Sequence, residues 1–263
     1  MVKLRCGTTS GPAIVAKPGL MLPTWRKSEN FDYQIITTGK NIMIETLQHI
    51  DASVFTFLNG MHTGYFDQLM WLISNKLAWL LMLVVLLFIL LRKGWRQALV
   101  GIVAIALVVV IADQVSSSLI KPLVERLRPS HEPSLATTVH LVNGYRGGPF
   151  GFVSSHAANH FGVALLLCLM LRDRWVWVTM MCWAAVVSYS RIYLGVHYPG
   201  DVICGMMVGF MAAGIVFMMW RVYERRWFPW QRDYVFNRHD SRLLSLVFPC
   251  NLLLLAIIAI FML

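Results

Sequence analysis

Apolar residues in this chain occur in long runs rather than in the short periodic patches of a soluble core. Six runs approach the roughly 17 to 25 residues that a helix needs to cross a bilayer. The sequence therefore predicts an all-α, polytopic membrane protein whose six transmembrane helices form a helical bundle. The third and fourth runs are long enough only if their polar ends also lie in the membrane. The expected spans are residues 69–91, 98–120, 157–171, 175–189, 202–220 and 243–263.

The sequence before the first span divides into a tail and a helix. Residues 1–43 contain three prolines and no sustained period, so we expect a disordered N-terminal tail. Residues 44–263 would form the membrane domain. Between residues 44 and 66, apolar side chains recur at helical spacing, which is typical of an amphipathic helix on the membrane interface. Asn59-Gly60 marks its expected break.

Composition agrees with a membrane protein. Hydrophobic residues make up 57% of the chain and charged residues 14%, about half the charged fraction of an average soluble domain. The net charge is +10, but the cations flank the apolar runs and form no stripe with interleaved aromatic residues. This distribution argues against nucleic-acid binding and suits lipid headgroups. The five cysteines form no CxxC pair, so we expect neither a disulfide framework nor a zinc site.

Cations are divided unevenly between two sets of connections. The connections after the first, third and fifth spans hold eleven Lys and Arg residues, and those after the second and fourth hold five. The positive-inside rule places the richer set in the cytoplasm. Six cations in the N-terminal tail argue for the opposite orientation. The sequence thus predicts a multi-pass protein of the inner (plasma) membrane whose second set of connections faces the periplasm or the cell exterior.

The first candidate motif runs from Lys121 to Pro129. Lys121 and Arg128 are seven residues apart, so on one short helix they would lie two turns apart on the same face. Two fixed cations there would clamp a phosphate dianion, and an arginine can bind two of its oxygens at once. Ordinary membrane-flanking charge is the alternative for this motif alone.

The second motif opens the third span with Ser154, Ser155 and His156. Serine is a preferred helix N-cap, and the unpaired N–H groups of a first helical turn attract a phosphate together with the helix dipole. His156 could deliver a proton to a departing alkoxide. The alternative is a capped helix with an incidental histidine.

The third motif places His197 four residues before Asp201, and Arg191 ends the fourth span. A neighbouring carboxylate can fix the tautomer of an imidazole and leave its other nitrogen free to attack. Pro199 and Gly200 intervene, so the geometry has to come from a turn rather than from one helix face. A structural His–Asp pair at the membrane interface is the alternative.

Together these residues form the pattern Lys-x6-Arg-Pro, Ser-x-His and Ser-Arg-x5-His-x3-Asp. With this pattern the chain resembles the type 2 phosphatidic acid phosphatase family, which includes the vanadium haloperoxidases, over residues 45–220. The resemblance implies a membrane phosphatase that hydrolyses a lipid phosphate monoester or pyrophosphate through a phosphohistidine, with no metal or other cofactor. Its implied partners are the membrane and a lipid phosphate: polyprenyl pyrophosphate, phosphatidate, phosphatidylglycerol phosphate or a saccharolipid.

The resemblance also implies roles for single residues. His197 would attack phosphorus, Asp201 would orient it, and His156 would protonate the leaving alcohol and then help to activate water. The residues implied to hold the phosphoryl oxygens are Lys121, Arg128, Ser154, Ser155 and Arg191.

One departure from the family concerns the middle motif, where Val153 and Ser155 replace the usual proline and glycine. Glycine lets the backbone approach a phosphate closely. Because Ser155 keeps its N–H, we expect an altered substrate fit rather than lost activity.

Two other functions agree less well with the sequence. A six-helix transporter or scaffold would line a path through the membrane with charged residues, yet only Lys76 and Asp113 lie within the expected spans. Asp113 lies two turns before Lys121, where it could support the phosphate clamp. Haloperoxidase chemistry would leave the membrane spans unexplained, because a halide needs none.

His156 and His160 have a zinc-like spacing but no third ligand beside them, so no metal is expected. The sequence does not predict an oligomeric state.

Overall fold

The computed structural model describes residues 25–92, 94–227 and 238–263. The chain divides into two compact units, residues 1–48 and 49–263. The second unit holds every residue of the predicted site. Within the described ranges the regular structure is helical, and the one strand-like pairing is a bridge between Leu127 and Phe150. The predicted all-α class is therefore confirmed.

Helix α1 covers Trp25–Gly60 and ends at the predicted Asn59-Gly60 break. It begins much earlier than the expected start near residue 44, because no proline follows Pro23 in this stretch and the helix is free to form. Residues 25–43, predicted to belong to a disordered tail, are thus helical, and residues 1–24 lie outside the described part of the chain. The boundary between a tail and a membrane domain stays a prediction.

The first expected span is a bent pair of helices rather than one straight helix. Helix α2 (Gly64–Ser74) is followed by the short 3-10 turn η1 (Lys76–Trp79), which leads into α3 (Leu80–Leu91). The two arms meet at 72°. Asn75 causes the break, because its extended backbone ends α2 while its side chain accepts a hydrogen bond from the Leu77 N–H at 3.0 Å and caps the next turn.

The second span is continuous but not uniform. Helix α4 (Trp95–Asp113) widens into the π-helical segment η2 (Gln114–Ile120) and ends in α5 (Lys121–Val124). Glu125 then adopts a left-handed conformation with φ of 49°, which terminates the helix. Arg128 has extended backbone. The prediction that Lys121 and Arg128 share one helix face is therefore wrong, because the helix stops four residues before Arg128.

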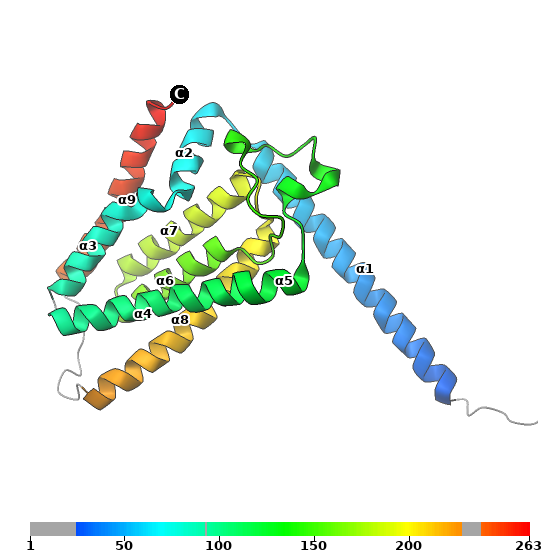
Figure 1. Cartoon of the computed structure of the whole chain (residues 1–263), viewed down its shortest axis with the longest axis horizontal. Helices are drawn as coiled ribbons and strands as arrows, with labels where there is room; N and C mark the ends of the chain where they lie inside the picture. The colour runs from blue at the N-terminus through cyan, green and yellow to red at the C-terminus, as the bar shows by residue number, and fades with distance from the viewer. Residues whose placement is uncertain (1–24, 93, 228–237) are drawn as a thin grey trace, which may run out of the picture. The chain divides into compact units, whose positions relative to one another are not determined.

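Four further helices follow in the described part of the chain: α6 (Ser155–Leu171), α7 (Arg174–Tyr193), α8 (Pro199–Trp227) and α9 (Arg238–Ile260). Helix α6 packs against α4, α7 and α8, and α9 packs against α2, α3 and α7 (Figure 1). The central position of α6 means that residues at its N-terminus are surrounded by the ends of several other helices.

Glycines allow α6 and α8 to approach very closely. A Cβ atom at Gly205 would lie 2.5 Å from the carbonyl oxygen of Ser154, and one at Gly209 would lie 2.2 Å from that of Ala158. Small residues at helix crossings are typical of membrane bundles, in which close backbone packing replaces the hydrophobic effect. This contact fixes the start of α8 beside the start of α6.

Among the residues that the structure describes, three helical stretches are long and apolar enough to cross a membrane, and the bent α2–α3 pair makes a fourth if it is one span. They are Trp95–Val124, Pro199–Arg226 and His239–Ile260. Helix α6 is apolar but shorter, and α7 does not belong to this group. A multi-pass helical membrane protein is thus confirmed, whereas the predicted count of six spans is not.

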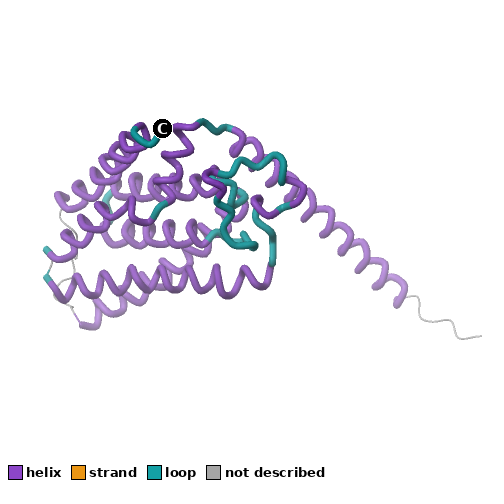
Figure 2. The backbone as a smooth tube through the Cα atoms, turned by 45° about the horizontal axis from the view of Figure 1, so that its top comes forward, coloured by secondary structure: helices purple, strands orange, loops and turns teal. Residues whose placement is uncertain are grey.

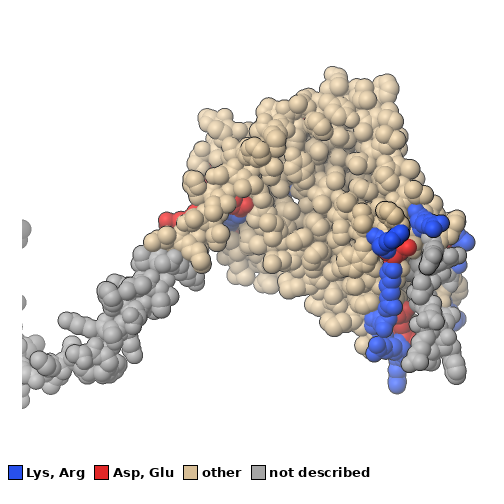
Figure 3. All heavy atoms as spheres, turned by 180° about the vertical axis from the view of Figure 1, so that it is seen from behind, with Lys and Arg blue, Asp and Glu red and all other residues tan. Residues whose placement is uncertain are grey.

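The two ends of the bundle differ in chemistry. Loops gather at the end where α5 and α7 finish and where α6 and α8 begin (Figure 2). Lys and Arg side chains concentrate at one end of the face that Figure 3 shows, and the rest of that face is almost without charge. Arg92, Arg96, Arg221, Arg225 and Arg226 lie where α3 and α8 finish and α4 begins, away from the loop end.

Candidate active site

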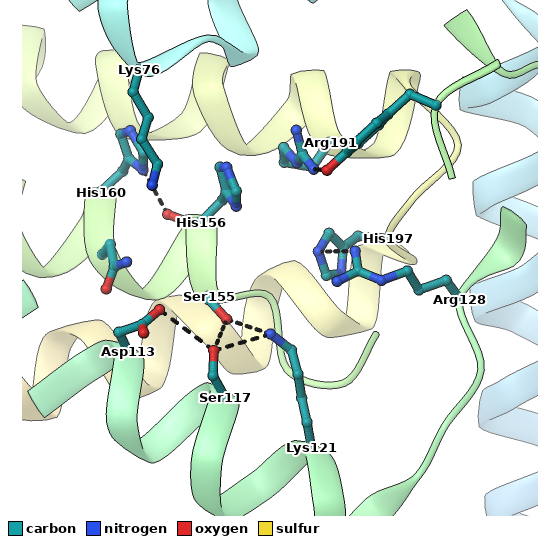
Figure 4. Close-up of a pocket in the computed structure, with 12 residues that line it drawn as sticks. Lys76, Asp113, Ser117, Lys121, Arg128, Ser155, His156, His160, Arg191 and His197 are labelled. Atoms are coloured by element: carbon teal, nitrogen blue, oxygen red, sulfur yellow. Dashed lines mark hydrogen bonds between the residues drawn. The ribbon is translucent and has the colours of Figure 1, made fainter. Parts of the chain in front are cut away.

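A polar cavity of about 240 Å³ lies where the loop end meets the helices (Figure 4). Six of the eight predicted site residues line it, and the other two, Ser154 and Asp201, do not. The residues that line the cavity are Lys76, Asp113, Ser117, Lys121, Arg128, Tyr145, Ser155, His156, Asn159, His160, Arg191 and His197.

The imidazole of His197 is held in one tautomer by Arg128. His197 lies in the turn between α7 and α8 and is 1% exposed. Its Nε2 atom is 2.9 Å from Nη1 of Arg128, which also donates to the Val196 carbonyl oxygen at 3.1 Å. A guanidinium can only donate, so Nε2 is the acceptor and carries the lone pair. The ring proton of neutral His197 is therefore on Nδ1, which faces Asp201.

Asp201 lies behind His197 and is fully buried. Its Oδ2 atom is 3.5 Å from Nδ1 of His197 and accepts a hydrogen bond from the Tyr198 N–H at 3.0 Å. Its Oδ1 atom accepts from Nη1 of Arg126 at 3.0 Å. The carboxylate is thus fixed on both oxygens and is placed to stabilise a positive charge on the ring.

The surroundings keep the His197 ring neutral. Burial lowers the pKa of His197 well below its ordinary value of 6.5, and the positive charges of Arg128, Arg191 and Lys121 lower it further. Desolvation and nearby like charge both disfavour the imidazolium form. A neutral ring with a free Nε2 lone pair is the nucleophilic form of histidine.

Arg191 reaches the cavity from the last turn of α7 and is 4% exposed. Its Nη1 atom donates to Oγ of Ser74, at the end of α2, and Nη2 donates to the hydroxyl of Tyr145 at 3.3 Å. Its guanidinium also lies 5.4 Å from the ring centre of Tyr145. Two segments outside α7 therefore fix the position of this cation.

Lys121 contacts Ser155 of α6 and Ser117, which lies one turn earlier in its own helical stretch (Figure 4). Its Nζ atom donates to Oγ of Ser155 and to Oγ of Ser117 at 3.4 Å, and the two hydroxyl oxygens are 2.8 Å apart. Ser117 lies 3.4 Å from Oδ1 of Asp113. The π-helical segment thus presents Ser117, and the start of α5 presents Lys121, toward α6, while Asp113 at the end of α4 contacts Ser117.

The two serines of the middle motif have different surroundings. Ser154 is the N-cap of α6, where its Oγ accepts from the Ala157 N–H at 3.4 Å, and its own N–H donates to the Asp201 carbonyl oxygen at 2.9 Å. Ser154 is fully buried and its side chain caps the helix instead of lining the cavity. Ser155 lines the cavity and contacts Lys121.

His156 enters the cavity from the first turn of α6. Its carbonyl oxygen accepts from Nδ1 of His160 at 2.7 Å, and the two rings are stacked with centroids 6.2 Å apart. The His160 ring also lies 4.9 Å from Trp183. In the described ranges, no group of three His, Cys, Asp or Glu residues is placed to hold a metal ion.

A loop pairing brings Arg128 next to Asp201. The Arg128 N–H donates to the Pro149 carbonyl oxygen at 3.0 Å, and the Gly151 N–H donates to that of Arg126 at 2.9 Å. A Cβ atom at Gly151 would lie 3.0 Å from Oδ2 of Asp201 and 3.1 Å from Cγ of Arg128. Gly151 is therefore needed where the two segments, the arginine and the carboxylate meet.

Comparison with known proteins identifies the family. A family model described as the PAP2 superfamily matches residues 97–227. A lipid A 4'-phosphatase of Bacteroides thetaiotaomicron is 46% identical over 169 residues, which are 64% of this chain and 75% of that relative. The chain belongs to the PAP2 superfamily. The family resemblance of the three motifs is thus confirmed.

Two further relatives agree with this PAP2 assignment. A lipid A 4'-phosphatase of Porphyromonas gingivalis is 37% identical over 185 residues, covering 70% of this chain and 78% of the relative. The crystal structure of Aquifex aeolicus LpxE matches with a TM-score of 0.50 at 22% identity, over 64% of this chain and 94% of that one. At this identity the structural match supports the fold alone. The PAP2 protein is a membrane lipid phosphatase, and a transporter or scaffold without catalysis is not favoured.

Sequence reasoning missed two residues that support the PAP2 site from behind. Arg126 pairs with Oδ2 of Asp51 at 2.8 Å as well as with Asp201, and its guanidinium lies 4.1 Å from the ring centre of Tyr198. Oδ1 of Asp51 accepts from the Gly200 N–H at 2.7 Å. This N–H is one of the unpaired donors at the start of α8, so α1 caps α8 with a carboxylate. Arg126 lies inside the first motif, whereas no sequence signal marks Asp51.

Proposed function

We propose that this lipid phosphatase hydrolyses the phosphate monoester of a saccharolipid of the lipid A type through a phosphohistidine on His197. The substrate class is supported by the two lipid A 4'-phosphatases, each covered by this chain over at least three quarters of its length. One observation carries the mechanism: Arg128 donates to Nε2 of the buried, neutral His197, beside a cavity lined by cations.

In the first step the substrate phosphate enters among Lys121, Arg128, Arg191 and Ser155. Arg128 transfers its hydrogen bond from Nε2 of His197 to a phosphoryl oxygen, which frees the lone pair to attack phosphorus. The N–P bond forms as the bond from phosphorus to the sugar oxygen breaks. His156, which becomes protonated when the phosphate dianion binds beside it, gives its proton to that oxygen, and the lipid leaves as an alcohol. Asp201 balances the positive charge that develops on the ring.

In the second step water displaces His197. The now neutral His156 takes a proton from the water as its oxygen bonds to phosphorus and the N–P bond breaks. Inorganic phosphate leaves, and His197 returns to its neutral form. His156 is again protonated, so the cycle closes without a net change in the protein.

Positioned positive charge carries the catalysis. Phosphoryl transfer passes through a loose transition state with charge spread over three oxygens, and catalysis depends mainly on positioning and electrostatic stabilisation. Lys121, Arg128 and Arg191 are each fixed by contacts with other segments. These fixed cations take the role that a divalent ion has in other phosphatases.

The proposal includes an orientation in the membrane. The cation-rich end of the bundle would lie in the cytoplasm according to the positive-inside rule. The loop end, with the cavity, would then face the periplasm or the exterior of the inner (plasma) membrane. A phosphate headgroup could enter there while acyl chains remain in lipid.

The test uses purified protein in detergent with EDTA and follows phosphate release from lipid A, phosphatidate and a polyprenyl diphosphate. We expect metal-independent release from lipid A, inhibition by vanadate, and loss of about a thousandfold or more in His197→Ala and His156→Ala. His49→Ala is the matched control, because His49 is exposed on α1 and outside the cavity. An acid-labile, base-stable phosphoprotein should accumulate in His156→Ala and be absent in His197→Ala. Full turnover by His197→Ala would exclude this mechanism.

A further inference from the structure

Lys76 is a cation in the cavity that belongs to none of the three motifs. It follows Asn75, at the break between α2 and η1. The two arms around this break are together apolar enough to form one bent span. Within a membrane, a broken helix is tolerated where it lines a polar cavity. The break serves the site on both sides, because Ser74 before it holds Arg191 and Lys76 after it lines the cavity.

A lysine at such a position is costly without an anionic or polar partner. In the described part of the chain no carboxylate forms an ion pair with Lys76. Its side chain points toward His156 and His160, from the opposite side of the cavity to Lys121 and Ser117 (Figure 4). Lys76 therefore presents a charged donor on the side of the cavity where His156 lies.

Asn159 adds an acceptor to the same wall. It lies one helical turn after His156 on α6 and lines the cavity. Its Oδ1 atom is buried and has no hydrogen-bond partner among the described residues. A buried polar atom without a partner is destabilising, because it has lost its hydrogen bonds to water. A ligand that donates a hydroxyl or amide proton would remove this cost.

The cavity has room for more than the transferred phosphate. Its volume of about 240 Å³ is many times the roughly 10–15 Å³ that one water occupies on this measure. In the proposed mechanism His156 faces the leaving oxygen. The substrate atoms next to that oxygen would then lie toward Lys76 and Asn159.

We propose that Lys76 and Asn159 form a second polar subsite that binds the sugar of the leaving group, on the carbon atoms next to the scissile phosphate. Lys76 would donate to a hydroxyl oxygen of the sugar, and Asn159 would accept from a hydroxyl or amide N–H. The subsite rests on the proposed function and selects among lipid phosphates. A phosphatidate leaving group has no sugar hydroxyl for Lys76 and no donor for Asn159, and a prenyl diphosphate offers anionic oxygens but no donor.

The experiment measures kcat/KM for lipid A, phosphatidate and a polyprenyl diphosphate in the wild type, Lys76→Met and Asn159→Leu. We expect each variant to lose at least about tenfold more on lipid A than on phosphatidate, because a site built to pair with sugar groups discriminates against ligands without them. Activity on the prenyl diphosphate distinguishes the roles of the two residues. Its anionic oxygens can bind Lys76, so Lys76→Met should lose activity on it, but they offer no donor to Asn159, so Asn159→Leu should not. Lys76→Arg should recover part of the selectivity.

Two readouts separate folding from selectivity. Vanadate inhibition should persist in each variant, because vanadate occupies the phosphate clamp. Leu77→Met is the matched control at the break, since Leu77 is 75% exposed and outside the cavity. Equal losses on all substrates, or none, would overturn the subsite while leaving the phosphatase intact. A wild type that releases phosphate from phosphatidate but not from lipid A would overturn the proposed function and the subsite together.

Discussion

The two ends of the catalytic cavity are built in different ways. At the nucleophile end, His197, Arg128 and Asp201 are buried and joined by hydrogen bonds to segments far away in the sequence. At the leaving-group end, Lys76 is exposed and Asn159 keeps an unpaired oxygen. The first end is preorganised for phosphoryl transfer, which demands fixed charge. The second is open enough to meet the variable part of a lipid substrate.

The preorganised end depends on backbone packing as much as on charged groups. Ser154 caps α6 and also donates its N–H to the Asp201 carbonyl oxygen at 2.9 Å, so it joins α6 to α8. Gly205, one turn further along α8, lies directly against the Ser154 carbonyl oxygen. A change there would alter the nucleophile end without touching a catalytic group.

The largest effect is expected for Gly205→Leu. A Cβ atom at this position would lie 2.5 Å from the Ser154 carbonyl oxygen, and backbone cannot move aside as a flexible side chain can. The start of α8 should separate from α6, and Asp201 and His197 should move away from the clamp. We expect loss of monodisperse protein in detergent, measured by size-exclusion chromatography, and loss of phosphate release.

Gly214→Leu in the same helix is the matched control. A Cβ atom there meets nothing within 4 Å, so a leucine should be accommodated. Glycine is also roughly 1 kcal/mol less favourable than alanine in a helix, so Gly214→Ala should be neutral or stabilising. If Gly205→Leu kept the stability and activity of Gly214→Leu, close packing of α6 and α8 would not be what fixes the site.

A smaller effect is expected behind the nucleophile, for Arg126→Met. The change removes the ion pair with the buried Asp201 and the link to Asp51. Mutation of the groups that orient the ligands of a metal site from behind typically lowers activity about 10- to 100-fold. Arg126 stands in the same relation to Asp201 and His197. We expect a loss in kcat of this size with little change in KM, because Arg126 does not line the cavity. Steady-state kinetics on lipid A would measure the two parameters separately.

Conservative changes sharpen this prediction. Arg126→Lys keeps the charge and should restore part of kcat. Asp51→Asn should cause a smaller loss than Arg126→Met, because Asp201 keeps its arginine. A loss that appears mainly in KM, or that Arg126→Lys does not relieve at all, would contradict a positioning role for Arg126.

The nucleophile end could be predicted from sequence better than the rest of the cavity. The spacings around His197, Arg128 and Lys121 belong to a family pattern, and the structure places these residues around one cavity. The predicted geometry of Lys121 and Arg128 was wrong, because Arg128 reaches the site through a loop pairing and not along a helix face. Spacing along the chain predicts a helix face only while the helix continues.

The supporting residues could not be predicted because their partners are distant in sequence. Asp51 accepts a hydrogen bond from a backbone N–H that lies 149 residues later in the sequence. Ser74 accepts one from Arg191, which lies 117 residues later. Such pairs leave no local pattern. The break at Asn75 was also missed, because one polar residue in an apolar run is a weak signal and its capping role depends on backbone geometry.

The smallest effect concerns the pH dependence of the nucleophile end. The neutral form of His197 attacks, and burial together with Arg128 lowers its pKa well below 6.5. A lower pKa keeps the ring neutral at more acidic pH, so the acid limb that His197 contributes to kcat/KM should lie below 6.5. Arg128→Gln removes a neighbouring positive charge. The pKa of His197 should then rise and this limb should move to higher pH.

The measurement compares normalised kcat/KM profiles of the wild type, Arg128→Gln and Arg146→Gln, since kcat/KM follows the ionisation of the free enzyme. Ionisation of the substrate phosphate affects all three proteins equally, so a difference between the profiles comes from the protein. Arg146 is exposed on the same connection and outside the cavity, so its variant should follow the wild type. Identical acid limbs for Arg128→Gln and the wild type would show that Arg128 clamps phosphate without tuning the nucleophile, and the contrast between the two ends would then rest on geometry alone.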